Sequence, residues 1–315
     1  MAEKEKSCAF RTSIGGQALI EGILMRGPKK EAIVIRTKEG LVTKVEDIKA
    51  TKDKYPILGW PFVRGVVNLI ASLANGMRAL TYSAQFMPED EQEQPDKFDQ
   101  WIEKKFGSEK ADNIIVTISV VLGIIIAVGL FILLPTLIAG LFDSVISAPV
   151  IRNLIEGVLR IVIFLLYIWL VSKMEDIRRV WMYHGAEHKT IYCYEAGLEL
   201  TVENCREMSR LHPRCGTSFL FIVMIVSILV FSVVSVNHML LRLVLRIVML
   251  PVVVAISYEI IKYAGRHDNW LTKIISAPGK AIQNFTTAEP DDSMLEVAIE
   301  AMKLVIPENE GDAQW

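Results

Sequence analysis

The sequence predicts an α-helical membrane protein with four transmembrane helices and a small cytoplasmic β-rich unit at the N-terminus. Three observations lead to this fold class. Hydrophobic residues make up 52% of the 315 residues, and the mean hydropathy is +0.36. The apolar residues are concentrated in a few runs of bilayer-spanning length. The net charge of −2 gives no general affinity for nucleic acid, so the expected surroundings are the lipid bilayer.

The β-rich unit is expected within residues 1–60. The first residues, MAEKEKSCAFRTS, lack an apolar core, so no cleavable signal peptide is expected. The string IVIRTKEGLVTKVEDI contains two runs rich in β-branched residues around Lys38-Glu39-Gly40, which predicts a hairpin. The preceding string, SIGGQALIEGILMRGPKK, carries four glycines that suit tight turns or close backbone approach. It lacks the GxGxxG and GK[ST] patterns of phosphate-binding loops. Glu21 and Arg26 in this string could pair with each other, or face the histidine loop described below.

Two further segments precede the first predicted span. Residues 61–86 are mostly apolar with a few Arg and Asn interruptions, which indicates an interfacial or core helix. Residues 87–113 begin with the acidic, proline-containing string MPEDEQEQPDK, and we expect a linker followed by a short helix.

The predicted transmembrane helices form two pairs, within residues 114–172 and 218–261. Arg160, Arg242 and Arg246 lie near the ends of these spans, where long cationic side chains can extend to the membrane surface. Pairing with Glu156 is the alternative for these arginines. The four individual spans are expected at residues 114–142, 153–172, 218–236 and 240–261.

Lysine and arginine placement predicts the orientation of the chain. These residues are frequent in the N-terminal segment, in the 173–217 loop and in the 262–315 tail, and rare in the two short connections. Both termini and the long loop are therefore expected on the cytoplasmic side. The tail contains an amphipathic helix from about Asp291 to Val305, preceded by acidic capping residues. We expect this helix to dock on the cytoplasmic domain, with a partner protein as the alternative.

The 173–217 loop carries the clearest functional signal. Its first part is predicted to continue the second span as a helix that leaves the membrane. In WMYHGAEHKT, His184 and His188 are four residues apart and share one helix face, the spacing that lets two imidazoles bind one Zn²⁺. Glu187 lies beside them, and the string fits the H-x-x-E-H pattern of inverted zincins. The alternative is a helix end whose two histidines are satisfied by backbone or water.

The second part of the loop, RLHPRCGTSF, adds His212 and Cys215 just before the third span. If all four side chains bind Zn²⁺ or another divalent metal, the site is saturated and structural. If only three bind, a coordination position stays open and Glu187 becomes a candidate general base. Cys193 and Cys205, between the two parts, are expected to be small buried residues. Cys205 falls within a short helix that is predicted to start near Thr201.

These strings resemble the YqhQ-like family of bacterial membrane proteins. The matching strings are GGQALIEGILMRGP, YHGAEHKTIYCYEAG, RLHPRCGTSFLFIVMIVSILVF and TTAEPDDSMLEVAIEA, which run in this order through most of the chain. The resemblance implies a multi-pass protein of the bacterial cell membrane that has been regarded as a metal-dependent enzyme. It implies no substrate and no reaction.

Two functional hypotheses follow. The first is a membrane-bound zinc-dependent hydrolase, with a peptidase as the favoured type. In this hypothesis Glu187 is the catalytic base, and the metal ligands are His184, His188, His212 and Cys215. The second is a non-catalytic scaffold or assembly factor, in which the His/Cys cluster is structural and a membrane or cytoplasmic protein is the partner. A transporter is less favoured because the spans lack a midplane pair of acidic residues. His267, after the fourth span, is interpreted as a helix-end residue rather than as a further ligand.

Overall fold

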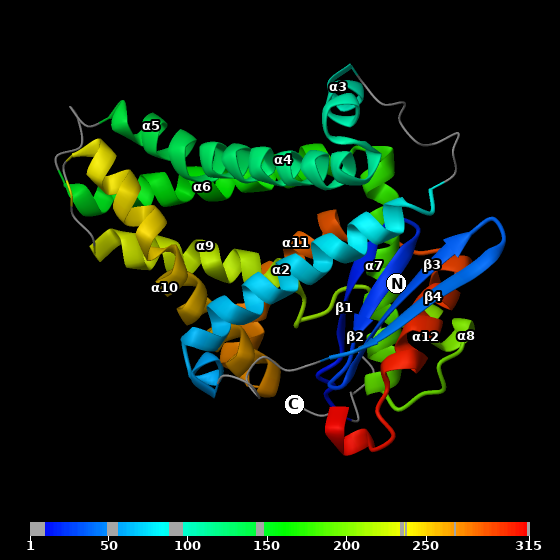
Figure 1. Cartoon of the computed structure of the whole chain (residues 1–315). Helices are drawn as coiled ribbons and strands as arrows, with labels where there is room; N and C mark the ends of the chain where they lie inside the picture. The colour runs from blue at the N-terminus through cyan, green and yellow to red at the C-terminus, as the bar shows by residue number, and fades with distance from the viewer. Residues whose placement is uncertain are drawn as a thin grey trace. The chain divides into compact units, whose positions relative to one another are not determined.

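The computed structural model describes residues 10–48, 56–87, 97–142, 148–233, 236, 238–267 and 269–313. These residues are mostly helical, with a four-stranded antiparallel sheet near the N-terminus (Figure 1). The chain forms two compact units. The first contains Met1–Met87, Tyr167–Ser227 and Met249–Trp315, and the second contains Pro88–Leu166 and Ile228–Val248.

The sheet belongs to the first unit, and its strands run in the order β1-β2-β3-β4. The predicted hairpin is confirmed, because Thr37 pairs with Gly40 across a two-residue turn. The glycine-rich string was expected to form turns, but most of it forms β1 and β2. Close backbone approach is confirmed at Gly22, where a Cβ atom would lie 2.5 Å from the Val34 carbonyl oxygen. The strands are β1 (Gly15–Leu19), β2 (Gly22–Arg26), β3 (Lys30–Thr37) and β4 (Gly40–Asp47).

One face of the sheet packs on helix α12 (Asp292–Val305), which also contacts α7 (Glu175–Glu195). Met294, Leu295 and Met302 of α12 are fully buried in this core together with strand residues such as Met25. The Asp291 side chain accepts a hydrogen bond from the Met294 backbone N–H and caps the helix. The expected amphipathic helix is thus confirmed, and its apolar face packs on the sheet.

Shorter elements complete the first unit. The predicted helix near Thr201 is confirmed, with the Thr201 side chain as its cap. The beginning and the end of the described chain meet where the Ser13 N–H donates to the Ala313 carbonyl oxygen at 2.6 Å. The shorter elements of the first unit are η1 (Pro56–Gly59), α2 (Val63–Ala84), α8 (Val202–Arg206), α11 (Trp270–Thr286) and η3 (Glu310–Ala313).

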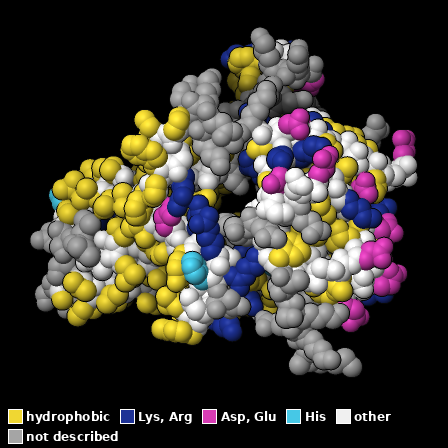
Figure 2. All heavy atoms as spheres, turned by 90° about the horizontal axis from the view of Figure 1, so that it is seen from below, with side chains coloured by type: hydrophobic (Ala, Val, Ile, Leu, Met, Phe, Trp, Pro, Cys, Tyr) yellow, Lys and Arg dark blue, Asp and Glu magenta, His cyan; other side chains and the backbone are white. Residues whose placement is uncertain are grey.

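Three helical stretches are long and apolar enough to cross a membrane: Ile114–Gly140, Val150–Val171 and Leu240–Arg266. The third predicted span, residues 218–236, corresponds to a shorter apolar helix, Gly216–Ser232, within the described residues. Figure 2 shows hydrophobic side chains gathered in one region of the visible face, whereas acidic side chains gather in another. The helices outside the first core are α3 (Lys97–Phe106), α4 (Ser108–Val128), η2 (Gly129–Leu133), α5 (Leu134–Gly140), α6 (Pro149–Val171), α9 (Gly216–Val233) and α10 (Met239–Arg266).

A buried polar cluster lies inside the second unit. Glu156 on α6 accepts hydrogen bonds from Thr136 at 2.9 Å, from Arg160 at 3.2 Å and from Arg246. Arg246 also donates to the Asn153 side chain. The expectation that the arginines extend to the membrane surface is therefore wrong for Arg160 and Arg246. The alternative, pairing with Glu156, is confirmed for these two residues, and it compensates their buried charges. Arg242 is buried as well.

The second apolar helix does not continue unbroken toward the histidines as expected. Helix α6 ends at Val171 and α7 begins at Glu175. Met174 between them has extended backbone and serves as the cap residue of α7, which has Glu175 and Asp176 in its first turn. The acidic pair favours a new helix start at this point, because carboxylates stabilise the positive end of the helix dipole.

Candidate metal centre

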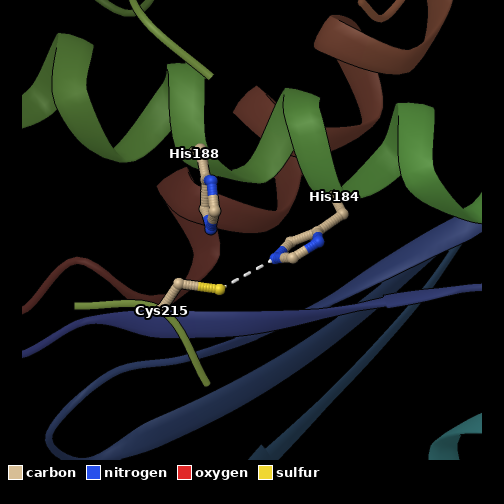
Figure 3. Close-up of side chains that lie close together, drawn as sticks. All are labelled: His184, His188 and Cys215. Carbon is tan, nitrogen blue, oxygen red and sulfur yellow. Dashed lines mark hydrogen bonds between the residues drawn. The ribbon is translucent and has the colours of Figure 1, made fainter. Parts of the chain in front are cut away.

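Helix α7 and the residue before α9 bring three metal-ligating side chains together in the first unit. His184 and His188 lie one turn apart on α7, with ring centroids 4.4 Å from each other. Both rings point toward Cys215 (Figure 3). The His184 Nε2 atom lies 3.1 Å from the Cys215 sulfur. One ligand atom from each of the three side chains lies within 4.8 Å of the other two, and the group is buried.

Backbone carbonyls fix the orientation of both imidazoles. The His184 Nδ1 atom lies 2.7 Å from the Thr286 carbonyl oxygen, and the His188 Nδ1 atom lies 2.5 Å from the Arg210 carbonyl oxygen. A carbonyl oxygen only accepts, so each Nδ1 carries a proton and each Nε2 is left to face Cys215. Metal-ligating histidines usually have this arrangement, with the second nitrogen held by a carbonyl or carboxylate.

The free nitrogen of His188 supports the fit to a metal. His188 is 1% exposed, and its Nε2 atom has no hydrogen-bond partner of acceptable geometry among the residues that the structure describes. Buried polar atoms of side chains are nearly always satisfied, so an orphaned imidazole nitrogen calls for an explanation. A divalent metal shared by His184, His188 and Cys215 would provide one.

Gly185 explains how the Thr286 carbonyl reaches the site. A Cβ atom on Gly185 would lie 2.1 Å from the Ala288 carbonyl oxygen, so only glycine allows the backbone after α11 to approach α7 this closely. The Ala288 N–H donates to the Trp181 carbonyl oxygen at 2.9 Å and fixes the contact. Gly185 therefore serves packing, and the close approach that it allows lets the Thr286 carbonyl orient His184.

Glu187 lies beside the three candidate ligands and is buried, with 5% of its surface exposed. Its Oε1 atom accepts a hydrogen bond from the Gly16 N–H at 3.1 Å. A Cβ atom on Gly16 would lie 3.0 Å from the Glu187 carboxyl carbon and 2.8 Å from the Leu24 carbonyl oxygen. Strand β1 can therefore lie this close to Glu187 only because residue 16 is a glycine. The Oε2 atom is buried and has no hydrogen-bond partner within the described part of the chain. The Glu187 carboxylate is therefore held in place through Oε1, and its Oε2 atom is left available beside the three candidate ligands.

Burial and charge set the protonation of these groups. Burial raises the pKa of Glu187 above its usual range, although His184 and His188 partly oppose the shift. Burial alone would lower the pKa of His184, but the Cys215 thiolate and Glu187 outweigh it and raise that pKa to about 9. In the same way, burial alone would raise the pKa of Cys215, but His184 and His188 hold it well below its usual range. The sulfur is thus favoured as a thiolate, the form that binds metal.

His212, the fourth expected ligand, lies outside the group of three. It is buried, and its Nε2 atom lies 3.5 Å from a Glu195 carboxylate oxygen. Its ring centroid is 5.6 Å from that of His188. Burial lowers the pKa of His212 to about 4, and the nearby Arg214 adds to this while Glu195 opposes it. His212 is therefore a neutral neighbour of the three ligands.

Several residues of the site gave no signal in the sequence. Gln283 of α11 donates to the His212 carbonyl oxygen and accepts from the His212 N–H, each at 2.7 Å. Glu195 accepts from the Thr12 N–H at 2.8 Å and from Arg214. These partners lie far apart in the chain, and the Thr286 carbonyl is a backbone group that no side-chain pattern reveals. Short-range spacing could not have found them.

The remaining sequence-based candidates lie as follows. Cys193 and Cys205 are fully buried, as expected for small apolar residues. His267 is exposed at the end of α10, where its ring stacks on Tyr263, which fits a helix-end residue. Glu21 does not pair with Arg26. It pairs with Arg179 of α7 at 2.5 Å, on the helix that carries the histidines.

Comparison with known proteins identifies relatives of this chain. Residues 60–308 match the family described as protein of unknown function (DUF1385). The chain is 33% identical over 294 residues to the uncharacterized protein YqhQ of Bacillus subtilis (strain 168), with 91% of this chain and 90% of that protein covered. No solved structure matches. The family match covers more than half of the sequence, and the relative matches nearly the whole of it. The chain therefore belongs to the DUF1385 family.

Proposed function

We propose that this protein is a membrane-anchored, zinc-type metal-dependent hydrolase whose centre is formed by His184, His188 and Cys215. One observation carries the proposal. Both imidazoles have Nδ1 held by a backbone carbonyl, and both present Nε2 toward the same thiolate. This geometry supports a metal better than a pair of satisfied helix-end histidines, because the latter would not leave the His188 Nε2 atom buried without a partner.

The membrane part of the proposal is a bacterial inner-membrane protein with four spans and both termini in the cytoplasm. Three helical stretches of membrane length and one shorter apolar helix support it. The lysine and arginine content of the 173–217 loop supports the cytoplasmic placement of the metal centre.

The donor set indicates which metal and which chemistry. One thiolate and two imidazoles, which become neutral when a metal displaces the proton from Nε2, suit Zn²⁺. Three protein ligands leave one position of a tetrahedral site open, as in catalytic zinc sites. When bound, the metal would supply a Lewis acid that polarises a water or a carbonyl group.

The protein's contribution to the reaction is the carboxylate of Glu187. It is buried beside the three ligands, it is oriented by the Gly16 N–H, and its second oxygen is unengaged within the described chain. Its raised pKa brings it closer to the pH at which a general base works best. We therefore assign Glu187 as the group that takes the proton from the attacking water.

Metal analysis of the purified full-length protein tests the first step. We expect about one zinc per chain by elemental analysis, lost in His184→Ala, His188→Ala and Cys215→Ser. Cys205→Ser is the matched control, because Cys205 is equally buried but lies outside the group, and it should retain the metal. Absence of stoichiometric zinc in wild type purified without chelators, or its retention in Cys215→Ser, would contradict the proposed centre.

Glu187→Gln tests the second step. The variant should retain zinc and lose at least about 100-fold in the hydrolysis of fluorogenic ester and peptide substrates, because general-base catalysis contributes about 10²–10⁴-fold. Unchanged hydrolysis in this variant would remove Glu187 from the mechanism.

The alternative is a structural metal in a non-catalytic scaffold. The closeness of His212 favours it, since a ring 5.6 Å from His188 could turn and complete a closed site. Cobalt(II) substitution separates the two functions. An open site predicts a visible spectrum that changes with pH and with an added hydroxamate, and a closed site predicts a spectrum that changes with neither.

A further inference from the structure

Helix α11 has the reverse polarity of a helix in a water-soluble domain. Its exposed side is mainly apolar, with Trp270 and Ile274 73% and 60% exposed, although it also carries Lys273 and Asn284. Its buried side consists mainly of small or polar residues. In a soluble protein the apolar face would be buried and the polar face would meet water. The exposed stripe comprises Trp270, Ile274, Ala277, Ala281 and Phe285, and the buried stripe comprises Thr272, Ser276, Gly279, Ile282, Gln283 and Thr286.

The buried polar side of α11 faces the metal centre and the residues around it. Gln283 is hydrogen-bonded to both backbone groups of His212. The Thr286 carbonyl orients His184. A Cβ atom on Gly279 would lie 2.5 Å from the Cβ atom of Ser218, so α11 and the start of α9 are in close contact. The polar side is therefore fixed toward the protein, and the apolar stripe faces outward.

The position of α11 in the chain indicates what covers this stripe. The apolar helix α10 ends at Arg266, and α11 begins four residues later at Trp270, with Asn269 as its cap. A helix that starts this close to the end of a span lies at the membrane boundary. Tryptophan is enriched at this boundary, and Lys273 and Lys280 can extend toward the lipid headgroups.

Helix α2 repeats the pattern independently. Ile70 and Leu73 are 61% and 63% exposed. The residues that α2 buries are small: Gly65, Gly76, Ala79 and Ser83. Its first turns are attached to the last part of α10, where Arg64 pairs with Glu259 and Asn68 donates to the Tyr258 hydroxyl. Two helices thus leave apolar faces open beside the same end of one apolar helix.

From these observations we propose that the apolar faces of α11 and α2 dock on the lipid of the cytoplasmic membrane surface. The metal centre on the other side of α11 then lies within about one helix diameter, roughly 10–12 Å, of the lipid. The proposal rests on the proposed insertion of α10 in the membrane, but it does not require that the centre be catalytic.

Spin-label accessibility tests the proposal on the full-length chain. A nitroxide is placed at Ile274, Ala277 or Ala281 in a Cys8→Ser background, in nanodiscs of phosphatidylethanolamine and phosphatidylglycerol. The probes are molecular oxygen, which partitions into lipid, and a water-soluble nickel chelate. Lys303, exposed on α12, is the matched control position. A sample without an introduced cysteine corrects for labelling of the native thiols.

We expect oxygen collisions to exceed nickel collisions several-fold at the three stripe positions, with the opposite ratio at Lys303. Nickel accessibility at the stripe equal to that at Lys303 would overturn the proposal, because the stripe would then face water. Low accessibility to both probes would also overturn it, because a protein surface would then cover the stripe. Zinc content is measured on the same samples. A lipid-facing stripe without zinc leaves this inference standing and removes the metal function, whereas a water-facing stripe with zinc does the reverse.

Discussion

Helices α11 and α12 follow each other in the chain, but α12 buries its apolar face and α11 buries its polar face. Both are amphipathic, and both begin with a side-chain cap that accepts a hydrogen bond from a backbone N–H. Helix α12 buries its apolar residues against the sheet, whereas α11 buries its polar residues against the metal centre. The pattern of a helix therefore shows that it has two faces, but its surroundings decide which face points inward. Four predictions test this difference.

The largest effect is expected where α12 meets the sheet. Leu295→Ala should lower the free energy of unfolding by about 2–5 kcal/mol, because Leu295 is fully buried and the substitution leaves a cavity. The matched variant on α11, Ile274→Ala, should change it by less than about 0.5 kcal/mol, since Ile274 does not contribute to a protein core. Denaturant unfolding in detergent measures both. Equal effects would mean that α11 also packs its apolar face against protein.

The next effect is a loss of stability in acid that arises from His212. Burial lowers the pKa of His212 to about 4, whereas an unfolded histidine has a pKa of about 6.5. Between these values the unfolded chain binds more protons, so the free energy of unfolding should fall by about 3 kcal/mol as the pH drops through this window.

His212→Asn should remove most of this pH dependence, and His267→Asn, at an exposed position, should leave it unchanged. Unfolding curves recorded from pH 7 to pH 4 provide the measurement. The same pH dependence in wild type and His212→Asn would show that other groups cause the acid sensitivity.

A smaller effect is expected on the polar face of α11. Gln283→Leu keeps the size of the side chain but leaves the His212 N–H and carbonyl without their partner. The expected loss is about 1–3 kcal/mol, the range for a buried polar group left unsatisfied. Asn284→Leu, one residue along on the exposed side, is the control and should be nearly neutral. If both variants are neutral, the polar face does not stabilise the site.

The smallest effect concerns what the two helices share. Asp291 caps α12 through the Met294 N–H at 3.0 Å, and Asn269 caps α11 through the Thr272 N–H at 2.9 Å. Asp291→Ala and Asn269→Ala should each lower the free energy of unfolding by about 1 kcal/mol. A much larger loss for Asn269→Ala would indicate that the connection from α10 to α11 depends on this capping box.

Much of the fold could be predicted because its signals are local. Apolar runs, the turn at Lys38-Glu39-Gly40 and the caps at Thr201 and Asp291 each depend on a few neighbouring residues. Strands β1 and β2 were not predicted, because glycine disfavours strands and the sheet accepts it only where backbones come close. The break after α6 was also missed, since the segment Ser172–Met174 contains neither proline nor glycine.

The candidate site likewise has some features with local sequence signals and others that depend on the tertiary fold. The spacing of His184 and His188 follows from the helix period, and Cys215 was found because it is a metal-capable residue that follows His212 just before the third predicted span. The displacement of His212 depends on Glu195 and Gln283, which reach it only through the tertiary fold. Whether three or four ligands converge was therefore beyond any short-range pattern.

The discontinuous first unit has a consequence for biosynthesis. Its three chain segments are separated by apolar helices, so the sheet leaves the ribosome long before α12, on which it packs. At roughly 5–20 residues per second, this interval lasts on the order of tens of seconds. During that time the apolar face of the sheet has no permanent cover, and the Thr286 carbonyl that orients His184 has not been made. The nascent chain therefore depends on temporary shielding, and the candidate metal ligands can reach their final geometry only at the end of synthesis.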